Sequence, residues 1–291
     1  MPSGWSLGNY EEWRATCDTL HAHTQLLGKL AMALAPAEPN FQHAALRLSA
    51  RGWETGLLPA PNGSGGVVVA LDLLAHEAVI EHTNGLTRRI ALAPDRPVGD
   101  VTFEVLAALA QLAGGVQLDL TPAEVPWTVP LDADREHADY DCGQVAAYLA
   151  AATRAAFVLA AFRAPYPGRS TPVNAWWGSF DLAVSLFSEA PAQAAAGDAD
   201  VPGATDTQEF AVGWWPGDQR YGKAAFYAYA RPATEGFANS DLAPARWHAQ
   251  LGEYILDLDQ IRSAPDPHAV ALEFARSAFS QASGRRLQQP G

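Results

Sequence analysis

The sequence predicts an α+β protein built from two helix–antiparallel-meander–helix halves, and three observations lead to this prediction. Long segments carry apolar residues at helical spacing, and between them short segments alternate apolar and polar residues. Turn pairs such as Asn-Gly and Gly-Gly separate the short segments, as in antiparallel hairpins. The order helix, meander, helix occurs twice. We therefore expect sheets and helices packed around a central cleft, with halves at residues 1–130 and 131–291 forming one compact unit.

The first half starts with a predicted helix over residues 9–34, where apolar side chains recur at steps of three and four before two prolines. Residues 42–92 alternate in short runs and predict the first meander. Helical spacing returns at 99–113 and ends at a Gly-Gly pair, and the sequence VQLDL at 116–120 predicts one more strand. The proline-rich segment 121–130 is the predicted boundary between the halves.

The second half repeats this order. Asp141 precedes a long apolar run and Gln144 follows it at the spacing of a capping box, so Asp141 is predicted to cap the next helix. Residues 189–206 are rich in Ala, Gly, Asp and Pro and predict a surface loop, which would be either a solvated linker or a lid. The predicted elements are a helix at 141–164, strands at 172–187, 208–215, 223–230 and 249–257, and a helix at 266–282.

The charge of the chain argues against two classes of partner. Because the net charge is -13 and the pI is near 4.9, the protein repels phosphate backbones and anionic lipid head groups, and we expect neither nucleic acid nor a membrane as partner. The most apolar segment, residues 143–164, is interrupted by Gln144 and two arginines and is expected to be a buried helix. The two cysteines fit no disulfide framework and the N-terminus lacks a signal-peptide pattern, so a cytoplasmic location is expected.

The first polar cluster lies on the predicted N-terminal helix. His21, Gln25 and Lys29 are spaced four apart and share one face of the helix, whereas His23 points elsewhere. A polar stripe on an otherwise apolar helix needs partners. It indicates an acid/base group with hydrogen-bond donors, a buried polar network, or simply the solvated face of the helix.

A second cluster combines two irregular segments. Asn40 and His43 follow the proline stop of the first helix, and the stretch DREHADYD supplies Glu136, His137 and Tyr140. Loops positioned by a rigid scaffold often carry binding residues. We therefore take Asn40 and His43 as candidate substrate-binding residues.

The third cluster consists of two tryptophan-rich segments, NAWWGSFD and QEFAVGWW, which we expect on neighbouring strands. Tryptophan pairs with a few polar anchors are typical of a small-molecule pocket, and a tryptophan-rich core is the alternative. Polar groups beside the pairs favour a cavity, which His21 would also border, because a buried unpaired polar atom costs roughly 1–3 kcal/mol. The substrate-binding candidates of this cluster are Asn174, Trp176, Trp177, Asp181, Gln208, Trp214, Trp215 and Tyr227, and Glu209 is an acid/base candidate. Gln25 of the first cluster is a further substrate-binding candidate.

The common cofactor signatures are missing from the sequence. It contains no phosphate-binding loop, no dinucleotide-binding glycine fingerprint and no G-x-S-x-G turn. We therefore expect no cofactor.

Several stretches of the chain match the pattern of one bacterial family. They are TLH with TQLLGK, NFQHA, RGWETGLLP, DREHADYD, TPVNAWWGSFDLA, GWWPG, AFYAYA and LGEYILDLD. Over nearly its whole length the chain therefore resembles the bacterial domain-of-unknown-function family five-nine-nine-six.

The resemblance bears on a metal site. Members of the family tend to carry histidine where this chain has Asn174 and Gln208, and tryptophan where it has His23. Imidazoles at the first two places, beside nearby histidines and a glutamate, would form a nitrogen and oxygen metal site. Asparagine and glutamine bind transition metals poorly, so this member is expected to hold no metal.

These observations predict a metal-free acid/base enzyme or cyclase of specialised metabolism that acts on a largely apolar small-molecule substrate. His21, Lys29 and Glu209 would act in catalysis, where a well-placed group contributes on the order of a hundredfold or more. One alternative is a non-catalytic small-molecule-binding protein. The other is a metal-dependent enzyme that uses His21, His43 and Glu209.

Overall fold

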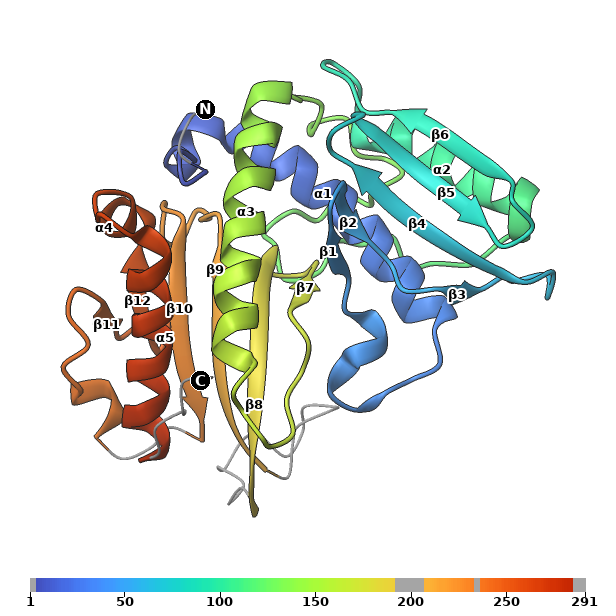
Figure 1. Ribbon diagram of the computed structural model, residues 1–291. Helices are drawn as coiled ribbons and strands as arrows, with labels where there is room; N and C mark the ends of the chain where they lie inside the picture. The colour runs from blue at the N-terminus through green and yellow to red at the C-terminus, as the bar shows by residue number, and fades with distance from the viewer. Residues whose placement is uncertain (1–3, 192–206, 233–235, 285–291) are drawn as a thin grey trace. The chain divides into compact units, whose positions relative to one another are not determined.

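The computed structural model describes residues 4–191, 207–232 and 236–284. It contains helices and two antiparallel sheets, which confirms the α+β class (Figure 1). Most of the predicted loop at 189–206, and with it the linker or lid, lies outside the described residues.

The chain forms two compact units, which we describe separately. The N-terminal unit comprises Tyr10–Ala150 and Ala175–Phe180, and the C-terminal unit comprises Met1–Asn9, Ala151–Asn174 and Asp181–Gly291. These limits differ from the predicted halves at 1–130 and 131–291. The proline-rich segment at 121–130 stays within the N-terminal unit, and the division falls inside helix α3 (Cys142–Arg163).

The N-terminal unit packs two helices with one antiparallel sheet. Its strand order is β1-β2-β4-β5-β6, and β3 pairs with β4. The predicted helices at 9–34 and 99–113 are confirmed as α1 and α2, and the predicted meander is confirmed as well. The elements are α1 (Tyr10–Leu34), η1 (Pro39–Ala44), β1 (Arg47–Ser49), β2 (Gly52–Glu54), β3 (Leu58–Pro59), β4 (Gly66–Asp72), β5 (Glu77–His82), β6 (Thr87–Ala91) and α2 (Val98–Ala113).

The strand predicted at 116–120 is wrong, because this segment forms neither helix nor strand. Val116, Leu118 and Leu120 are half-buried while the residues between them are exposed, so the alternation of the sequence survives in an extended chain. A strand also needs a neighbouring edge to pair with. The sequence pattern therefore predicts which side chains alternate in burial, but not whether a neighbouring strand is available for pairing.

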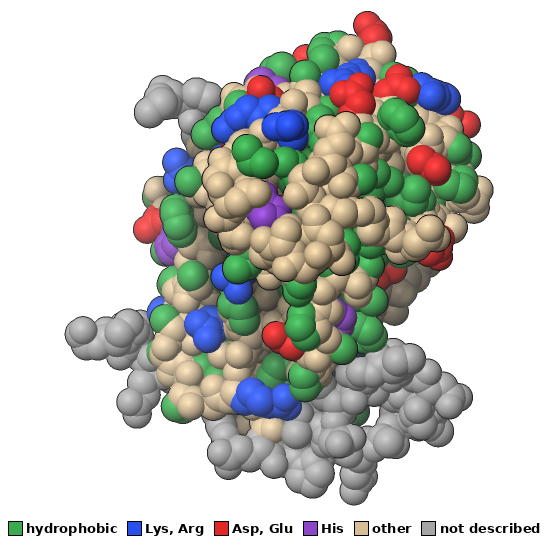
Figure 2. All heavy atoms as spheres, turned by 90° about the vertical axis from the view of Figure 1, so that its right-hand side faces the viewer, with side chains coloured by type: hydrophobic (Ala, Val, Ile, Leu, Met, Phe, Trp, Pro, Cys, Tyr) green, Lys and Arg blue, Asp and Glu red, His purple; other side chains and the backbone are tan. Residues whose placement is uncertain are grey.

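Charges of both signs are interspersed on the face of the molecule that Figure 2 shows. In the N-terminal unit, ion pairs join Arg51 to Glu81 and Arg89 to Glu77, each at 2.8 Å. Exposed pairs of this kind add little stability. They show that the acidic net charge is not spread as one uniform patch.

The C-terminal unit contains most of a six-stranded antiparallel sheet of order β11-β12-β10-β9-β8-β7. The predicted helices at 141–164 and 266–282 are confirmed as α3 and α5, whereas β11 and α4 were not predicted. The elements are α3 (Cys142–Arg163), β7 (Asn174–Trp176), β8 (Asp181–Pro191), β9 (Thr207–Trp215), β10 (Ala225–Arg231), η3 (Phe237–Asn239), β11 (Arg246–His248), β12 (Glu253–Asp257), α4 (Leu258–Arg262) and α5 (Pro267–Ser283).

Helices α3 and α5 pack on the same face of this sheet (Figure 1). Phe162 of α3 and Phe279 of α5 both contact Phe210 of β9, with ring centroids 6.1 and 5.4 Å apart. Phe226 and Trp214 are fully buried on this face. The aromatic residues at these alternate positions thus form the core of the unit.

Helix α3 is, within the described residues, the one helix that is long and apolar enough to cross a membrane. Half of its most apolar window is buried inside the protein. A core helix passes the same test of length and composition, so this is weak evidence for a membrane span.

The tryptophan pairs do not lie on neighbouring strands, which corrects the prediction. Strand β8 lies between β7, which holds Trp176, and β9, which ends with Trp214 and Trp215. Trp177 follows β7 in a turn. Strand β8 is formed by the sequence between the two tryptophan-rich segments, and in the meander it therefore lies between their strands.

Candidate functional site

The face of the C-terminal sheet opposite the two helices is rich in polar and aromatic side chains. In the register of the sheet, Tyr227 of β10 stands opposite Gly213 of β9, which stands opposite Ala183 of β8. Because side chains alternate between the two faces of a strand, every second residue from these positions shares their face. We call this surface the polar face; its functional groups are Asp181, Ser185, Glu209, Trp215, Tyr227, Tyr229, Arg231 and Glu253.

The buried end of the polar face is held by a hydrogen bond between two strands. The Tyr227 hydroxyl donates to the Asp181 carboxylate, and both side chains are buried. The phenol reaches β8 because it passes directly over Gly213, where a Cβ atom would lie 2.2 Å from the ring. Burial and the Asp181 charge raise the pKa of Tyr227 well above its ordinary value, so the phenol stays a hydrogen-bond donor.

An aromatic ladder runs along the polar face, made of Trp215, Tyr227 and Tyr229. The indole packs edge-on against the first tyrosine at 5.3 Å, and the two tyrosine rings are parallel, with an interplanar angle of 2° and centroids 6.2 Å apart. The Arg231 guanidinium lies over the Tyr229 ring at 4.8 Å. The ladder thus offers flat apolar surface and already receives one cation.

Glu209, a predicted acid/base residue, lies at the more open end of this face. Its carboxylate accepts a hydrogen bond from the Ser185 hydroxyl at 2.5 Å, and it stands opposite Arg231 in the register of β9 and β10. Both Glu209 and Ser185 are half-buried. This end of the polar face is therefore more accessible than the end at Asp181.

Glu253 is a functional group that the sequence analysis missed. It opens β12, pairs with His248 of β11 and shares the face of Ile255, which stands opposite Tyr227. Burial, and next the nearby charge of Asp181, raise the pKa of the Glu253 carboxyl from its usual 4.5 to about 7. A half-buried carboxyl whose pKa is raised to near neutral pH is typical of an acid/base site.

The remaining candidates of the third cluster are more scattered. Asn174 is buried in β7, and Trp176 is half-buried in the same strand. Gln208 is exposed. Trp214 is fully buried on the helix-covered face, so it belongs to the core rather than to the polar face.

The first cluster lies in the N-terminal unit, where Trp177 is its common partner. His21 and Gln25 each approach the Trp177 carbonyl, at 2.9 and 3.2 Å, and the Lys29 ammonium lies 5.8 Å from the centre of the indole ring. The shared face predicted for these three side chains is thereby confirmed. His23 is buried elsewhere, near the charged groups Asp134, Arg96 and His137.

The hydrogen bonds of this cluster secure irregular segments of the chain. Gln25 is fully buried, and its amide group exchanges two hydrogen bonds with the backbone of Ala123, at 2.9 and 3.0 Å. The His21 Nε2 atom faces the carbonyl oxygens of Trp177 and Gly178, which only accept, so this nitrogen carries a proton. The His21 ring also stacks on Phe180 at 4.9 Å. These contacts position the turn after β7.

The second cluster has local partners. His43 Nδ1 accepts from the backbone N–H of Glu38 at 3.1 Å, and Asn40 has a left-handed backbone with φ of 56°. His137 pairs with Asp134 at 2.7 Å. Burial opposes both pKa shifts of this pair, but the hydrogen bonds that Asp134 accepts still lower the pKa of its carboxyl, and the hydrogen bond and charge of Asp134 still raise the pKa of His137.

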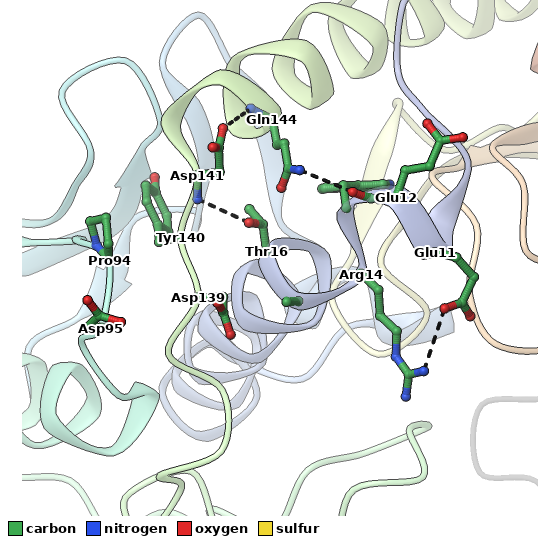
Figure 3. A pocket seen from close by; sticks show the side chains of 12 residues that line it. Glu11, Glu12, Arg14, Thr16, Pro94, Asp95, Asp139, Tyr140, Asp141 and Gln144 are labelled. Carbon is green, nitrogen blue, oxygen red and sulfur yellow. Dashed lines mark hydrogen bonds and ion pairs between the residues drawn. The ribbon is translucent and has the colours of Figure 1, made fainter.

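A pocket of about 420 Å³ opens in the N-terminal unit beside the start of α3 (Figure 3). Asp141 in its wall accepts a hydrogen bond from the Gln144 backbone at 2.8 Å, which confirms the predicted N-cap. The backbone N–H of Asp141 donates to Thr16, and the Gln144 side chain donates to the carbonyl of Glu12. The polar groups of this wall join α1 to α3.

Changing Asp141 to Ala should lower the free energy of unfolding by about 0.5–2 kcal/mol, because the first turn of α3 loses its cap. Urea unfolding measures this change. Asp139→Ala is the matched control, since Asp139 is an exposed acid in the wall of the same pocket. Equal effects of both substitutions would show that general charge, not capping, is responsible.

No group of three or more His, Cys, Asp or Glu side chains within the described ranges is arranged to hold a metal ion. The fold and the polar face define an α+β protein with a sheet face lined by acids and tyrosines. The chain matches the family of unknown function DUF5996 over residues 5–287 of 291 and belongs to that family, which confirms the resemblance. No curated protein matches the chain, and neither does any solved structure.

Proposed function

We propose that the protein is a small-molecule enzyme that moves a proton by acid/base catalysis at the polar face. The observation that supports this most strongly is the placement of Glu253 on the same sheet face as Asp181 and Tyr227. Two carboxyl groups whose surroundings differ can take different roles. Glu209 remains part of the proposed site, while His21 and Lys29 contribute to the fold of the N-terminal unit.

The three groups divide the work by their protonation states. Asp181, which accepts from Tyr227, acts as the ionised carboxylate. The phenol of Tyr227 acts as a hydrogen-bond donor that does not ionise, since its pKa is raised. Glu253, with a pKa of about 7, is present as acid and as base in similar amounts near neutral pH and therefore exchanges the proton with the substrate.

The surroundings favour a largely apolar substrate. The aromatic ladder of Trp215, Tyr227 and Tyr229 presents ring surface, and Ala183, Ala211 and Gly213 leave the floor between the strands free of large side chains. A proton that leaves one atom of such a molecule and returns to another produces an isomerisation or a ring closure, and neither reaction needs an external oxidant. Positioning on the ladder would supply the rest of the rate.

Incubation of the protein with a metabolite extract, followed by mass spectrometry, tests the proposal. We expect at least one metabolite to be consumed by the wild type and to be consumed about a hundredfold or more slowly by Glu253→Gln. Glu273→Gln on the exposed side of α5 is the matched control and should behave as the wild type. If a folded Glu253→Gln protein consumes the metabolite at the wild-type rate, or if the wild type consumes none, the proposal is wrong.

A further inference from the structure

We propose that the N-terminal unit contains a second catalytic site, in which the imidazole of His137, aligned by Asp134, removes a proton from water during the hydrolysis of a neutral or cationic ester. The pair lies in the segment between α2 and α3, residues 114–141, which forms neither helix nor strand. An irregular segment of this length is uncommon in a compact protein and often serves a function. The polar face, by contrast, belongs to the C-terminal unit.

The carboxylate of Asp134 fixes both the orientation and the tautomer of the imidazole. Asp134 is 3% exposed, and its Oδ1 atom accepts the backbone N–H groups of Glu136 and His137 at 2.9 and 3.1 Å. Its Oδ2 atom faces Nδ1 of His137 at 2.7 Å. Because a carboxylate only accepts hydrogen bonds, Nδ1 carries the proton. In the neutral imidazole, Nε2 therefore keeps its lone pair and is available as a base.

The free nitrogen of this imidazole is in contact with solvent. Within the described residues, Nε2 of His137 makes no hydrogen bond, and it is not among their buried polar atoms that lack a partner. An unpaired atom that is not buried must touch solvent, although the side chain as a whole is only 14% exposed. The accessible part of the ring is thus the nitrogen that can accept a proton.

Backbone hydrogen bonds hold the pair against the start of α2. The N–H groups of Val98 and Gly99 donate to the carbonyls of His137 and Asp134, each at 2.9 Å. A Cβ atom on Gly99 would lie 2.8 Å from the Asp134 carbonyl oxygen, so this close approach depends on glycine. A base that is held in this way keeps its orientation when a substrate binds.

The surroundings of His137 favour a substrate without negative charge. The half-buried Trp127 ring lies 4.4 Å from the imidazole and provides a flat apolar wall beside it. The carboxylates of Asp134, Asp18 and Glu136 all act on the imidazole, and they would repel an anion. A neutral or cationic ester with an aromatic or other flat part satisfies both conditions.

The hydrolysis of such an ester needs only water as a second reactant. The Nε2 atom of His137 takes a proton from a water molecule, whose oxygen bonds to the carbonyl carbon of the ester. The bond between that carbon and the alcohol oxygen then breaks, and the proton passes from the imidazolium to the leaving oxygen. The products are a carboxylic acid and an alcohol, and His137 returns to its neutral form.

The variant Asp134→Asn separates a catalytic role of the pair from a structural one. Its amide oxygen has to remain at the Oδ1 position, because two backbone N–H groups donate to that position. The amide NH₂ group then faces Nδ1 of His137 and donates to it, which moves the imidazole proton to Nε2. The hydrogen bonds that hold the segment are kept, whereas the base is lost.

Hydrolysis of p-nitrophenyl acetate, a neutral aryl ester, tests the proposal. We expect the wild type to be at least about tenfold faster than Asp134→Asn and than His137→Gln, whose amide still donates to Asp134 but is not a base. His268→Gln at an exposed position of α5 is the control and should keep the wild-type rate. Nitrogen NMR of isotopically labelled protein should find the proton of neutral His137 on Nδ1 in the wild type and on Nε2 in Asp134→Asn.

The rate of the wild type should rise with pH, since only the neutral imidazole accepts a proton. Burial lowers the pKa of His137, but the hydrogen bond and charge of Asp134, with the charges of Asp18 and Glu136, raise it overall. The rise should therefore be centred above the usual 6.5. His23 of α1 also acts on His137, but it stays neutral over this range because burial lowers its pKa to about 4.

Three results would overturn the proposal. They are a wild type that hydrolyses the ester no faster than His137→Gln, a folded Asp134→Asn protein that keeps the wild-type rate, and a neutral wild-type imidazole whose proton lies on Nε2. If Asp134→Asn does not fold, His137→Gln and the tautomer of the wild type still decide. None of these measurements involves the polar face, so their outcome is independent of the proposed function.

Discussion

Replacing His23 with phenylalanine should reduce the free energy of unfolding that the protein loses on acidification by on the order of 3 kcal/mol. The His23 side chain is buried, and this burial lowers the pKa of its imidazole from the usual 6.5 to about 4. As the pH falls from 6.5 towards 4, the unfolded chain takes up a proton that the folded chain refuses. The stability that depends on a neutral His23 is therefore fully present above pH 6.5 and is lost as the pH falls towards 4. Phenylalanine removes this proton and its cost.

Urea unfolding of wild type and variant over this pH range measures the effect. The difference between their free energies of unfolding should change with pH. A packing penalty from the larger ring shifts all pH values equally and leaves that change intact. His137 contributes with the opposite sign, because its pKa is raised, but it is present in both proteins. His268→Gln, at an exposed position of α5, is the control. Parallel curves for wild type and His23→Phe would contradict this account of His23.

Much of the secondary structure follows from the sequence because its signals are local. Helical spacing predicted α1, α2, α3 and α5, and the side chain of Asp141 predicted the start of α3. The segment 116–120 shows the limit of such signals: it keeps the alternation of a strand, but no pairing is formed. A strand depends on a partner that can lie anywhere in the chain, so its pattern alone is not sufficient.

The candidate site was partly predictable for the same reason. His21, Gln25 and Lys29 share a face because they lie on one helix, and their meeting with Trp177 follows from a contact that the sequence does not specify. Glu253 was overlooked because LGEYILDLD reads as an ordinary alternating strand. Its unusual protonation arises only when the register places it on the same sheet face as Asp181, although Asp181 lies on β8, three strands away from β12.

Changing Gly28 to Ala should destabilise the protein by about 1–3 kcal/mol, although alanine is normally better than glycine within a helix by about 1 kcal/mol. A Cβ atom on Gly28 would lie 2.0 Å from atoms of the Trp177 indole. The indole cannot easily withdraw, because His21 and Gln25 hold the carbonyl of Trp177.

A double-mutant cycle with Trp177→Ala separates the clash from the helix propensity, and urea unfolding of all four proteins provides the free energies. In the Trp177→Ala background the methyl group meets no indole, so Gly28→Ala should stabilise by up to about 1 kcal/mol and the sign of its effect should reverse. Gly143→Ala is the control, since Gly143 is an exposed glycine in the first turn of α3 whose Cβ would meet one carboxylate oxygen at 3.1 Å. If Gly28→Ala is as stable as the wild type, the indole moves freely, and the contacts from α1 do not hold the turn after β7.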